Sequence, residues 1–435
     1  MKILFVAAHL GGGAGKAISG MAALCGKRFD VETILLEAPQ EMKYVRVLQE
    51  SGIPWSVASN EREAADAVAR SDITILNWWN HPLTIRFLLD VRRVRCRMII
   101  WNHINGCYYP LLPAAFLNLF SHVLFTSPVS FENEGWSDAE RGQIMSRSSI
   151  VYGMGDFRPW ETAKKTDYVI RDERFTIGYV GTISYEKIHR DFIGFCAAAA
   201  RVVPHVECKM VGRLGPAFLE EVRGSGFEDL FSLAGFLENP RESYLSFDIF
   251  GYLLRPESYA TTENVLLEAM AHGLPIIVLN NPVERHIIQD GVNGFLVNDK
   301  EEYASKVFDL YRSESMRSRI GGKAREYVMD QYNPHANFLC FCQSIERAMD
   351  APRGVVDVEA LFRDGFGAFC YFSGMDQSTL EADIRAGHCP APEHLLAGTG
   401  ESKAGIAQYC RYFPHEERLG CLLEAAEIVR RSGGE

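Results

Sequence analysis

The sequence contains no apolar run of about 18 residues, so we expect no membrane-spanning helix. It also has no excess of basic side chains. With 45 Lys and Arg against 56 Asp and Glu, the formal net charge is -11, which argues against a nucleic-acid partner. The 11 cysteines are scattered without a repeating framework. These absences together predict a cytoplasmic protein with free thiols.

The 435 residues are enough for two domains, and 47% hydrophobic with 23% charged residues is ordinary for a globular protein. In the first half, short apolar runs alternate with helical patterns, which predicts a doubly wound α/β domain. The predicted strands are KILFVAA, VETILL, DITILNW, RMIIWNH and HVLFTS. Ligands of such sheets bind at the carboxyl ends of the strands. The segments of interest are therefore residues 9–16, 77–81, 101–106 and 126–127.

A polar linker punctuated by Gly and Pro, residues 153–176, precedes a second alternating series. Its predicted strands are FTIGYVGT, VECKMVG, FSLAGF, DIFGYLL, LPIIVL and GFLV. Residues 313–350 are predicted to form helices that finish this second α/β domain. The expected domains are 1–155 and 170–350, followed by a helical extension at 353–435.

The extension carries 8 basic and 13 acidic residues, so its net charge is -5. Its helix-like segments predict a small appendage that docks on the rest of the chain or on a partner. Cysteines and histidines in this stretch suggest a metal site, but none has the close Cys-x-x-Cys spacing that zinc favours. We therefore predict no metal there. The residues concerned are Cys370, Cys389, Cys410, Cys421, His388 and His394.

A glycine-rich loop follows the first predicted strand. Glycines let the backbone approach an anion, and the next helix presents free N–H groups to it. Two better-known motifs do not fit, because Ala17 stands where a Walker A loop needs Ser or Thr, and Lys16 where the dinucleotide fingerprint needs Gly. The loop is either an anion-binding loop or a plain tight turn. Its glycines are Gly11, Gly12, Gly13 and Gly15.

Residues 256–275, PESYATTENVLLEAMAHGLP, begin as a loop and continue with the apolar spacing of a helix. Thr261 or Thr262 is expected to cap this helix. Gly273 and Pro275 are expected to end it before the buried strand IIVL. Glu268 lies on or beside the apolar face, where an unpaired charge is costly. It is either half of a structural salt bridge or an acceptor for the hydroxyl groups of a ligand.

The run LLEAMAHGLPIIV, followed by Glu284 and GVNGFLV, resembles the donor-binding region of the retaining glycosyltransferases of family 4. These enzymes have the GT-B architecture, in which two Rossmann-like domains face each other across a cleft. The resemblance covers about residues 1 to 350 and implies sugar transfer, with retention, from a nucleotide-diphosphate sugar. In the family the helix glutamate binds the ribose, a role that falls to Glu268, and no metal or other cofactor is required.

The resemblance extends to the site of the diphosphate. Lys187 matches the family lysine, whereas Thr182 stands where the family has an arginine. Arg213, after another predicted strand, is either a replacement cation or a surface arginine. Backbone groups of the glycine-rich loops and of the helix start are implied to face phosphate, sugar or acceptor. The residues concerned are Gly12, Gly13, Gly181, Gly212, Thr262, Asn264 and Val265.

The resemblance is less complete at the sugar. Ala260 occupies the position of a second family glutamate that reaches the donor sugar. We expect Glu263 to be the substitute, pointing to the sugar or to solvent at the helix start. His103 stands where family members carry a sugar-contacting histidine, although it is also explained as an ordinary loop residue. Phe236 and Leu237 are expected near the nucleobase.

Two hypotheses concern surfaces. Trp78, Trp79 and Trp101 lie near predicted strand ends, where aromatic faces would stack on sugar rings.

A basic and apolar stretch from Arg86 to Phe120 has the composition of a membrane-touching surface, or of a solvated helix face beside the core. Peripheral contact with the inner membrane face would suit a lipid-linked acceptor.

The sequence therefore predicts a metal-independent, hexosyltransferase-like enzyme that uses a UDP- or GDP-linked sugar and a glycan, lipid-linked or protein acceptor. Metal independence is expected because no Asp-x-Asp pair follows a predicted strand end. Two alternatives remain open. One is a non-catalytic GT-B binding or scaffold subunit, suggested by Ala260 and Thr182, and the other is a GT-B nucleotide-sugar epimerase.

Overall fold

The computed structural model describes residues 1–39, 42–154, 165, 174–386 and 404–432. The chain divides into two compact units, which we call the first and second unit. The first unit comprises Met1–Gly155, Tyr259–Thr262 and His335–Glu435, and the second comprises Asp156–Ser258 and Glu263–Pro334. Most of the predicted linker, and Cys389, His388 and His394 of the extension, lie outside the described residues.

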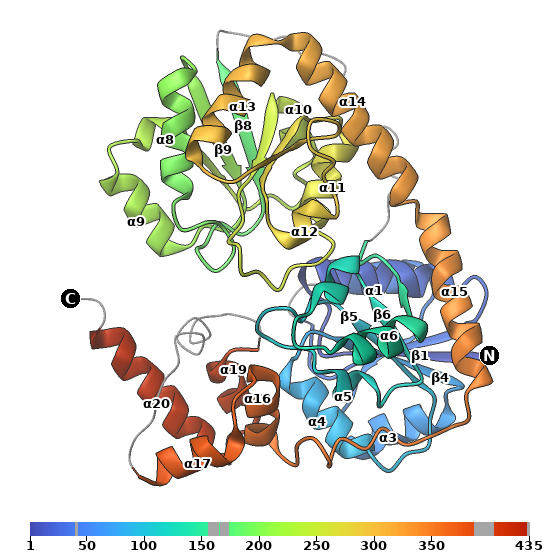
Figure 1. Cartoon of the computed structure of the whole chain (residues 1–435). Helices are drawn as coiled ribbons and strands as arrows, with labels where there is room; N and C mark the ends of the chain where they lie inside the picture. The colour runs from blue at the N-terminus through green and yellow to red at the C-terminus, as the bar shows by residue number, and fades with distance from the viewer. Residues whose placement is uncertain (40–41, 155–164, 166–173, 387–403, 433–435) are drawn as a thin grey trace. The chain divides into compact units, whose positions relative to one another are not determined.

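The first unit contains a seven-stranded parallel sheet in the order β3-β2-β1-β4-β5-β6-β7 (Figure 1). The five predicted strands are present. Two more, β3 and β7, are only three residues long and lack a recognisable apolar run. The strands are β1 (Lys2–Ala7), β2 (Asp30–Leu35), β3 (Trp55–Val57), β4 (Ile73–Trp78), β5 (Met98–Asn102), β6 (His122–Phe125) and β7 (Ser148–Ile150).

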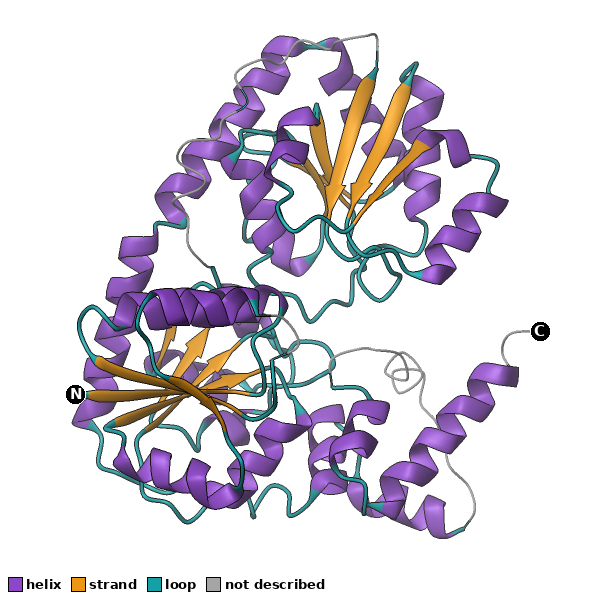
Figure 2. Cartoon of the chain, turned by 180° about the vertical axis from the view of Figure 1, so that it is seen from behind, coloured by secondary structure: helices purple, strands orange, loops and turns teal. Residues whose placement is uncertain are grey.

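Helices cover both faces of this sheet (Figure 2). This explains why β1, β4 and β5 read as continuous apolar runs, since a strand covered on both faces exposes neither to water. The helices are α1 (Gly12–Cys25), α2 (Lys43–Glu50), α3 (Glu61–Arg70), α4 (Pro82–Val91), α5 (Ala114–Leu117) and α6 (Asp138–Ser146), with a 3-10 turn at Pro128–Glu132.

The extension shares the hydrophobic core of the first unit. Phe372 lies with its ring centroid 5.2 Å from that of Trp78 and 5.0 Å from that of Phe116. The buried hydroxyl of Tyr409 donates to the Asn80 Oδ1 atom at 3.1 Å. The extension is therefore an integral part of the first unit. Its described helices are α16 (Gly365–Ser373), α17 (Gln377–Arg385), α19 (Ile406–Tyr412) and α20 (Glu417–Ser432).

The helix α15 (Pro334–Asp350) also belongs almost entirely to the first unit, although the predicted second domain extended to residue 350. Its Phe341 ring stacks on Phe5 of β1, with centroids 5.9 Å apart. The Asn337 side chain is hydrogen-bonded to both backbone groups of Tyr152. Apolar spacing alone predicted this helix, but its partner depends on tertiary contacts.

The second unit contains a six-stranded parallel sheet in the order β10-β9-β8-β11-β12-β13. All six predicted apolar runs form its strands: β8 (Phe175–Val180), β9 (Val206–Val211), β10 (Phe231–Gly235), β11 (Ile249–Tyr252), β12 (Ile276–Leu279) and β13 (Phe295–Val297). Its helices are α8 (Phe192–Val202), α9 (Pro216–Gly224), α10 (Arg241–Ser246), α11 (Asn264–Ala271), α12 (Pro282–Arg285), α13 (Lys300–Arg312) and α14 (Glu314–Gln331), with a 3-10 turn at Glu228–Leu230.

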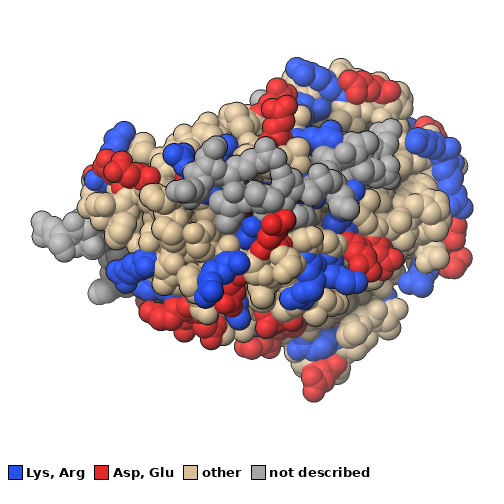
Figure 3. Space-filling view, turned by 90° about the horizontal axis from the view of Figure 1, so that it is seen from above, with Lys and Arg blue, Asp and Glu red and all other residues tan. Residues whose placement is uncertain are grey.

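The proposed membrane surface is not supported. Its apolar members Phe87, Phe116 and Phe120 are buried, and Arg92 Nε binds the carboxylate of Glu359 at 2.6 Å. Figure 3 shows a different face of the molecule, viewed from above, on which basic and acidic side chains are interspersed. Within the ranges that the structure describes, no helix combines the length and apolarity needed to cross a bilayer.

Candidate functional site

Each sheet has a point at which the strand order reverses, and ligands of doubly wound folds bind there. In the second unit, β8 is followed by β9 and β10 on one side, and β11 then returns to the other side of β8. The loop after β8 contains Lys187, and the segment after β11 leads to Glu263 and α11. The switch point of this sheet therefore lies where the sequence resemblance predicted the donor site.

Lys187 and Glu263 meet at this switch point. Lys187 Nζ lies 3.4 Å from Glu263 Oε2, and the exposed fractions of the two side chains are 28% and 10%. Tyr252, at the end of β11, donates its hydroxyl to the same carboxylate oxygen, and Lys187 Nζ lies 5.4 Å from its ring centroid. Glu263 was expected to point to the sugar or to solvent, but its carboxylate is instead held by the lysine and the tyrosine.

A second acidic group lies in this region. Glu284, on α12, is almost completely buried, and no hydrogen-bond partner of its Oε1 atom is found among the described residues. Burial, followed by the charge of Glu263, raises the pKa of Glu284 to about 8. Glu284 is therefore protonated near neutral pH, so this pair of carboxyl groups carries one negative charge rather than two.

Glu268 lies on α11, as predicted, and its carboxylate is oriented by a neighbour. The Tyr244 hydroxyl donates to Glu268 Oε2 at 3.0 Å. The Tyr244 ring stacks on His272, with centroids 4.8 Å apart, and His272 Nδ1 is 2.7 Å from the backbone oxygen of Glu268. A tyrosine held by this stacking fixes the direction in which the carboxylate points.

The predicted cap of α11 was wrong. The helix begins at Asn264, and Glu263 is the residue before it. The Thr262 hydroxyl donates instead to the backbone oxygen of Thr126 and accepts from the Gly153 amide, both within the first unit. The helix end agrees with prediction, because Gly273 has φ of 80°, a conformation that favours glycine.

The glycines after β8 and β9 pack closely against each other. Gly181 and Gly212 have φ values of 142° and 151°. A Cβ atom on Gly212 would lie 1.7 Å from the Gly181 carbonyl oxygen, so only glycine fits there. The neighbouring Arg213 is exposed, and its carbonyl accepts from the Ile183 amide at 2.9 Å. Close packing thus explains Gly212 without a ligand.

Phe236 and Leu237, expected near the nucleobase, follow β10. Their exposed fractions are 65% and 41%, which is high for large apolar side chains. They remain available for a planar ligand, as the prediction requires.

In the first unit, the glycine loop opens α1 directly, because the helix begins at Gly12. Gly12 has φ of 55°, and both Gly12 and Gly13 are exposed. His103 is partly buried; its Nε2 lies 3.0 Å from Asn77 Oδ1, and its ring lies 4.8 Å from that of Trp101. His103 is thus held in place by its neighbours. This agrees both with a histidine that contacts the sugar and with an ordinary loop residue.

The predicted role of the tryptophans was wrong for two of them. Trp78 and Trp101 lie within β4 and β5 and are completely buried. Trp101 Nε1 donates to the Val151 oxygen at 3.0 Å. Trp79 is also buried, with 2% of its surface exposed. Trp78 and Trp101 fill the core rather than face a ligand, because they lie inside strands that are covered on both faces and not beyond the strand ends.

Sequence analysis missed Glu37, which lies beside His9 and His81. Glu37 is two residues beyond β2, and His9 is two residues beyond β1. The available signal was the position of Glu37 just past a buried strand, but the segment after the second predicted strand was not among the segments of interest.

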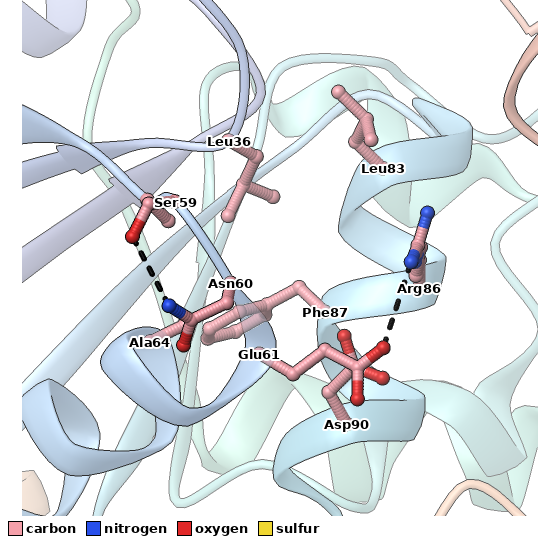
Figure 4. Close-up of a pocket in the computed structure, with 10 residues that line it drawn as sticks. Leu36, Ser59, Asn60, Glu61, Ala64, Leu83, Arg86, Phe87 and Asp90 are labelled. Carbon is pink, nitrogen blue, oxygen red and sulfur yellow. Dashed lines mark hydrogen bonds and ion pairs between the residues drawn. The ribbon is translucent and has the colours of Figure 1, made fainter.

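A cavity of about 180 Å³ lies elsewhere in the first unit, between α3 and α4 (Figure 4). Its floor is apolar, and Arg86 Nη2 lies 3.5 Å from Glu61 Oε1 at its rim. Burial and the charge of Glu61 raise the pKa of Asp90 to about 6. The lining residues are Leu36, Ala58, Ser59, Asn60, Glu61, Ala64, Leu83, Arg86, Phe87 and Asp90. None of the predicted site residues lines it.

Residues 174–313 match the family model described as Glycosyl transferases group 1. The chain is 30% identical over 178 residues to N-acetyl-alpha-D-glucosaminyl L-malate synthase of Bacillus anthracis, covering 39% of this chain and 45% of that protein. It is 26% identical over 105 residues to the lipopolysaccharide core biosynthesis glycosyltransferase LpsE of Rhizobium meliloti, covering 24% of this chain and 30% of that protein. The chain thus spans less than half the length of these curated relatives.

Solved structures are similar over most of the chain. HepE of Anabaena, in complex with UDP-glucose, superimposes with a TM-score of 0.63 at 16% identity, covering 80% of this chain and 99% of that one. The fold is GT-B. Sucrose-phosphate synthase of Thermosynechococcus elongatus is similar with the same coverage and identity, at a TM-score of 0.58. The predicted pair of Rossmann-like units in a GT-B fold is confirmed.

Proposed function

We propose that this GT-B protein is a glycosyltransferase that moves a sugar from a UDP-sugar to a glycan, lipid-linked or protein acceptor. The observation that carries the proposal is the meeting of Lys187 and Glu263 at the switch point of the second sheet, with Glu268 one turn further along α11. All three lie within the matched residues 174–313. HepE of Anabaena, which has a similar fold, was solved with UDP-glucose.

In this proposal Lys187 contacts the diphosphate and Glu268 accepts hydrogen bonds from the ribose hydroxyls. The Tyr244 hydroxyl would keep the Glu268 carboxylate in one orientation. The amides of Asn264 and Val265 open α11, where the helix dipole favours a negative phosphate. Balancing the leaving diphosphate by a lysine and amides requires no divalent ion, which is the basis for proposing metal independence at the donor.

Glu263 is proposed to act through Lys187. A carboxylate 3.4 Å from the lysine lowers the effective positive charge and limits the positions that the ammonium group can occupy. Because Glu284 is protonated near neutral pH, the region does not carry a second anion that would repel diphosphate. Retention of configuration and a sugar contact by His103 belong to the same proposal and follow from the family resemblance.

The test is nucleotide binding by calorimetry with purified protein, comparing UDP with GDP. We expect saturable UDP binding that is weakened in Lys187→Ala. Lys323→Ala, which removes an exposed lysine of α14, is the control. Losing a charge-assisted contact lowers the affinity by about 1.5–3 kcal/mol. Absence of binding by either nucleotide would overturn the proposal. Incubation with UDP-glucose and product analysis would then distinguish transfer or hydrolysis from epimerisation.

The non-catalytic alternative keeps one specific observation in its favour. Ala260 supplies no carboxylate, and its backbone oxygen accepts from the Asn105 side chain at 2.8 Å. The segment Tyr259–Thr262 is thus anchored to the first unit. UDP binding without turnover of any UDP-sugar would favour a binding subunit over an enzyme.

A further inference from the structure

The switch point of the first sheet holds its own cluster of side chains. Here β1 is followed by β2 and β3 on one side, and β4 lies on the other side of β1. Three side chains lie just past neighbouring strands of this sheet. His9 is two residues beyond β1, Glu37 two beyond β2 and His81 three beyond β4. One nitrogen or oxygen atom from each lies within 4.8 Å of the others. His81 Nε2 is 3.8 Å from Glu37 Oε1, and the two imidazole rings are 5.5 Å apart.

The extension completes the surroundings of this cluster. The Tyr412 hydroxyl, on α19, donates to Glu37 Oε2, and the Tyr412 ring lies 5.0 Å from that of His81. Because Oε2 is bound by the tyrosine, Oε1 is the oxygen near His81. The exposed fractions of the His81 and Glu37 side chains are 1% and 18%.

The neighbours of Glu37 are histidine and tyrosine side chains. Within the described ranges, its carboxylate contacts His81 and Tyr412 and forms no ion pair with Lys or Arg. His81 Nδ1 accepts a hydrogen bond from the Leu83 amide at 3.2 Å, which only an unprotonated nitrogen accepts. The other ring nitrogen of His81, Nε2, is the one that lies near Glu37. Two imidazoles and one carboxylate that converge in this way present three ligand atoms to a positive ion.

The spacing suits an ion better than a direct hydrogen bond. At 3.8 Å, His81 Nε2 and Glu37 Oε1 are too far apart for a hydrogen bond. Metal–nitrogen and metal–oxygen bonds of about 2.1 Å each reach across this gap at a wide angle. Two imidazoles with one carboxylate are typical of first-row transition metals rather than of Mg²⁺ or Ca²⁺, which favour oxygen ligands.

We propose that His9, Glu37 and His81 bind one divalent transition-metal ion, such as Zn²⁺ or Co²⁺. Three protein ligands leave a coordination position for water or for an oxygen of a bound molecule. Tyr412 is a positioning residue that turns Glu37 Oε1 toward the ion. For Nε2 of His81 to bind the metal, the ring proton moves from Nε2 to Nδ1, and the hydrogen bond from the Leu83 amide breaks.

The test uses the full chain without an affinity tag, stripped by chelation and titrated with Co²⁺. We expect one ion per chain, with the visible absorption of nitrogen- and oxygen-bound Co²⁺ and without the charge-transfer band of a thiolate ligand. Added Zn²⁺ should displace the bound Co²⁺. His9→Ala and Glu37→Gln should lower the affinity at least about tenfold, and Tyr412→Phe, which keeps the ring, about tenfold. His415→Ala, an exposed histidine of the extension, is the matched control.

Circular dichroism should show that each variant is folded. Hydrogen exchange provides a second measurement, because the Leu83 amide should exchange faster once the metal is bound. Failure of the wild type to bind Co²⁺, equal binding by Glu37→Gln, or a thiolate band would overturn the proposal. Binding is measured without any nucleotide, so this result and the outcome for the proposed glycosyltransferase are independent of each other.

Discussion

Lys187 and Glu263 form an ion pair across the switch point of the second sheet, with 3.4 Å between Nζ and Oε2. Each comes from a loop that follows a different strand, β8 for the lysine and β11 for the glutamate. The pair therefore joins the two loops that border the proposed diphosphate site. Breaking this ion pair should change the position of the Lys187 ammonium group more than the stability of the second unit.

Glu263→Gln should reduce sugar transfer more than it reduces UDP binding. The amide keeps the size of the side chain but no longer holds the Lys187 ammonium group by charge, and small displacements at a reacting centre lower rates by about a hundredfold. UDP affinity should change by less than about fivefold, since a partly exposed ion pair contributes at most about 1 kcal/mol. The measurements are calorimetric affinity and initial rate. Equal rates for variant and wild type would contradict this role.

Glu268→Ala should weaken UDP binding by about 1.5–3 kcal/mol, the contribution of a charge-assisted hydrogen bond, while the protein stays folded. Tyr244→Phe should weaken it less, because it removes only the hydroxyl that orients the carboxylate. Glu257→Ala, an exposed glutamate of the preceding loop, is the control. Unchanged UDP affinity in a folded Glu268→Ala protein would remove Glu268 from the site.

Glu284 should make the protein less stable as pH rises. Its pKa is near 8 in the folded protein and has an ordinary value near 4.5 when unfolded, so the folded state binds the extra proton between these values. The stabilising contribution is complete below about pH 4.5 and is lost as pH rises to about 8. Glu284→Gln, which imitates the protonated acid, should therefore gain in Tm relative to wild type between pH 5 and pH 8. A difference in Tm that stays constant with pH would argue against the raised pKa.

Phe372→Ala should destabilise the first unit by about 3–5 kcal/mol, the usual cost of removing a completely buried phenylalanine. Its ring packs on Trp78 and Phe116, so the extension and the sheet should unfold together. Val355→Ala, at an exposed position of the extension, should change stability by less than about 0.5 kcal/mol. Urea denaturation followed by tryptophan fluorescence measures both. A small effect of Phe372→Ala would indicate an appendage that folds separately.

UDP binding should persist in excess EDTA. The proposed diphosphate contacts are Lys187 and backbone amides, none of which needs a divalent ion. The comparison is the calorimetric UDP affinity with EDTA and with added Mn²⁺. A large loss of affinity in EDTA that Mn²⁺ restores would show that the donor site depends on a metal.

Local sequence pattern predicted most of the fold. The eleven runs expected as strands all occur, and most are visible in the sequence because a strand covered on both faces is largely apolar. The strands β3 and β7 were missed because their three residues are only partly buried and include serine, whereas the equally short β13 is apolar throughout. The helix that carries Glu268 was also predicted, since its apolar spacing and Gly273 are local features.

Tertiary structure alone decided which partners the site residues have. Glu263 was identified by its place before a helix, but its pairing with Lys187 depends on two strands that the sheet order makes neighbours. Tyr412 and Glu37 are likewise distant in sequence, and their contact follows from the packing of α19 on the first unit. Sequence periodicity reports whether a residue is buried, because burial is a property of one element. Sequence periodicity does not report which other helix or strand packs against a buried residue, since that depends on how all the helices and strands of the unit bury their apolar faces together.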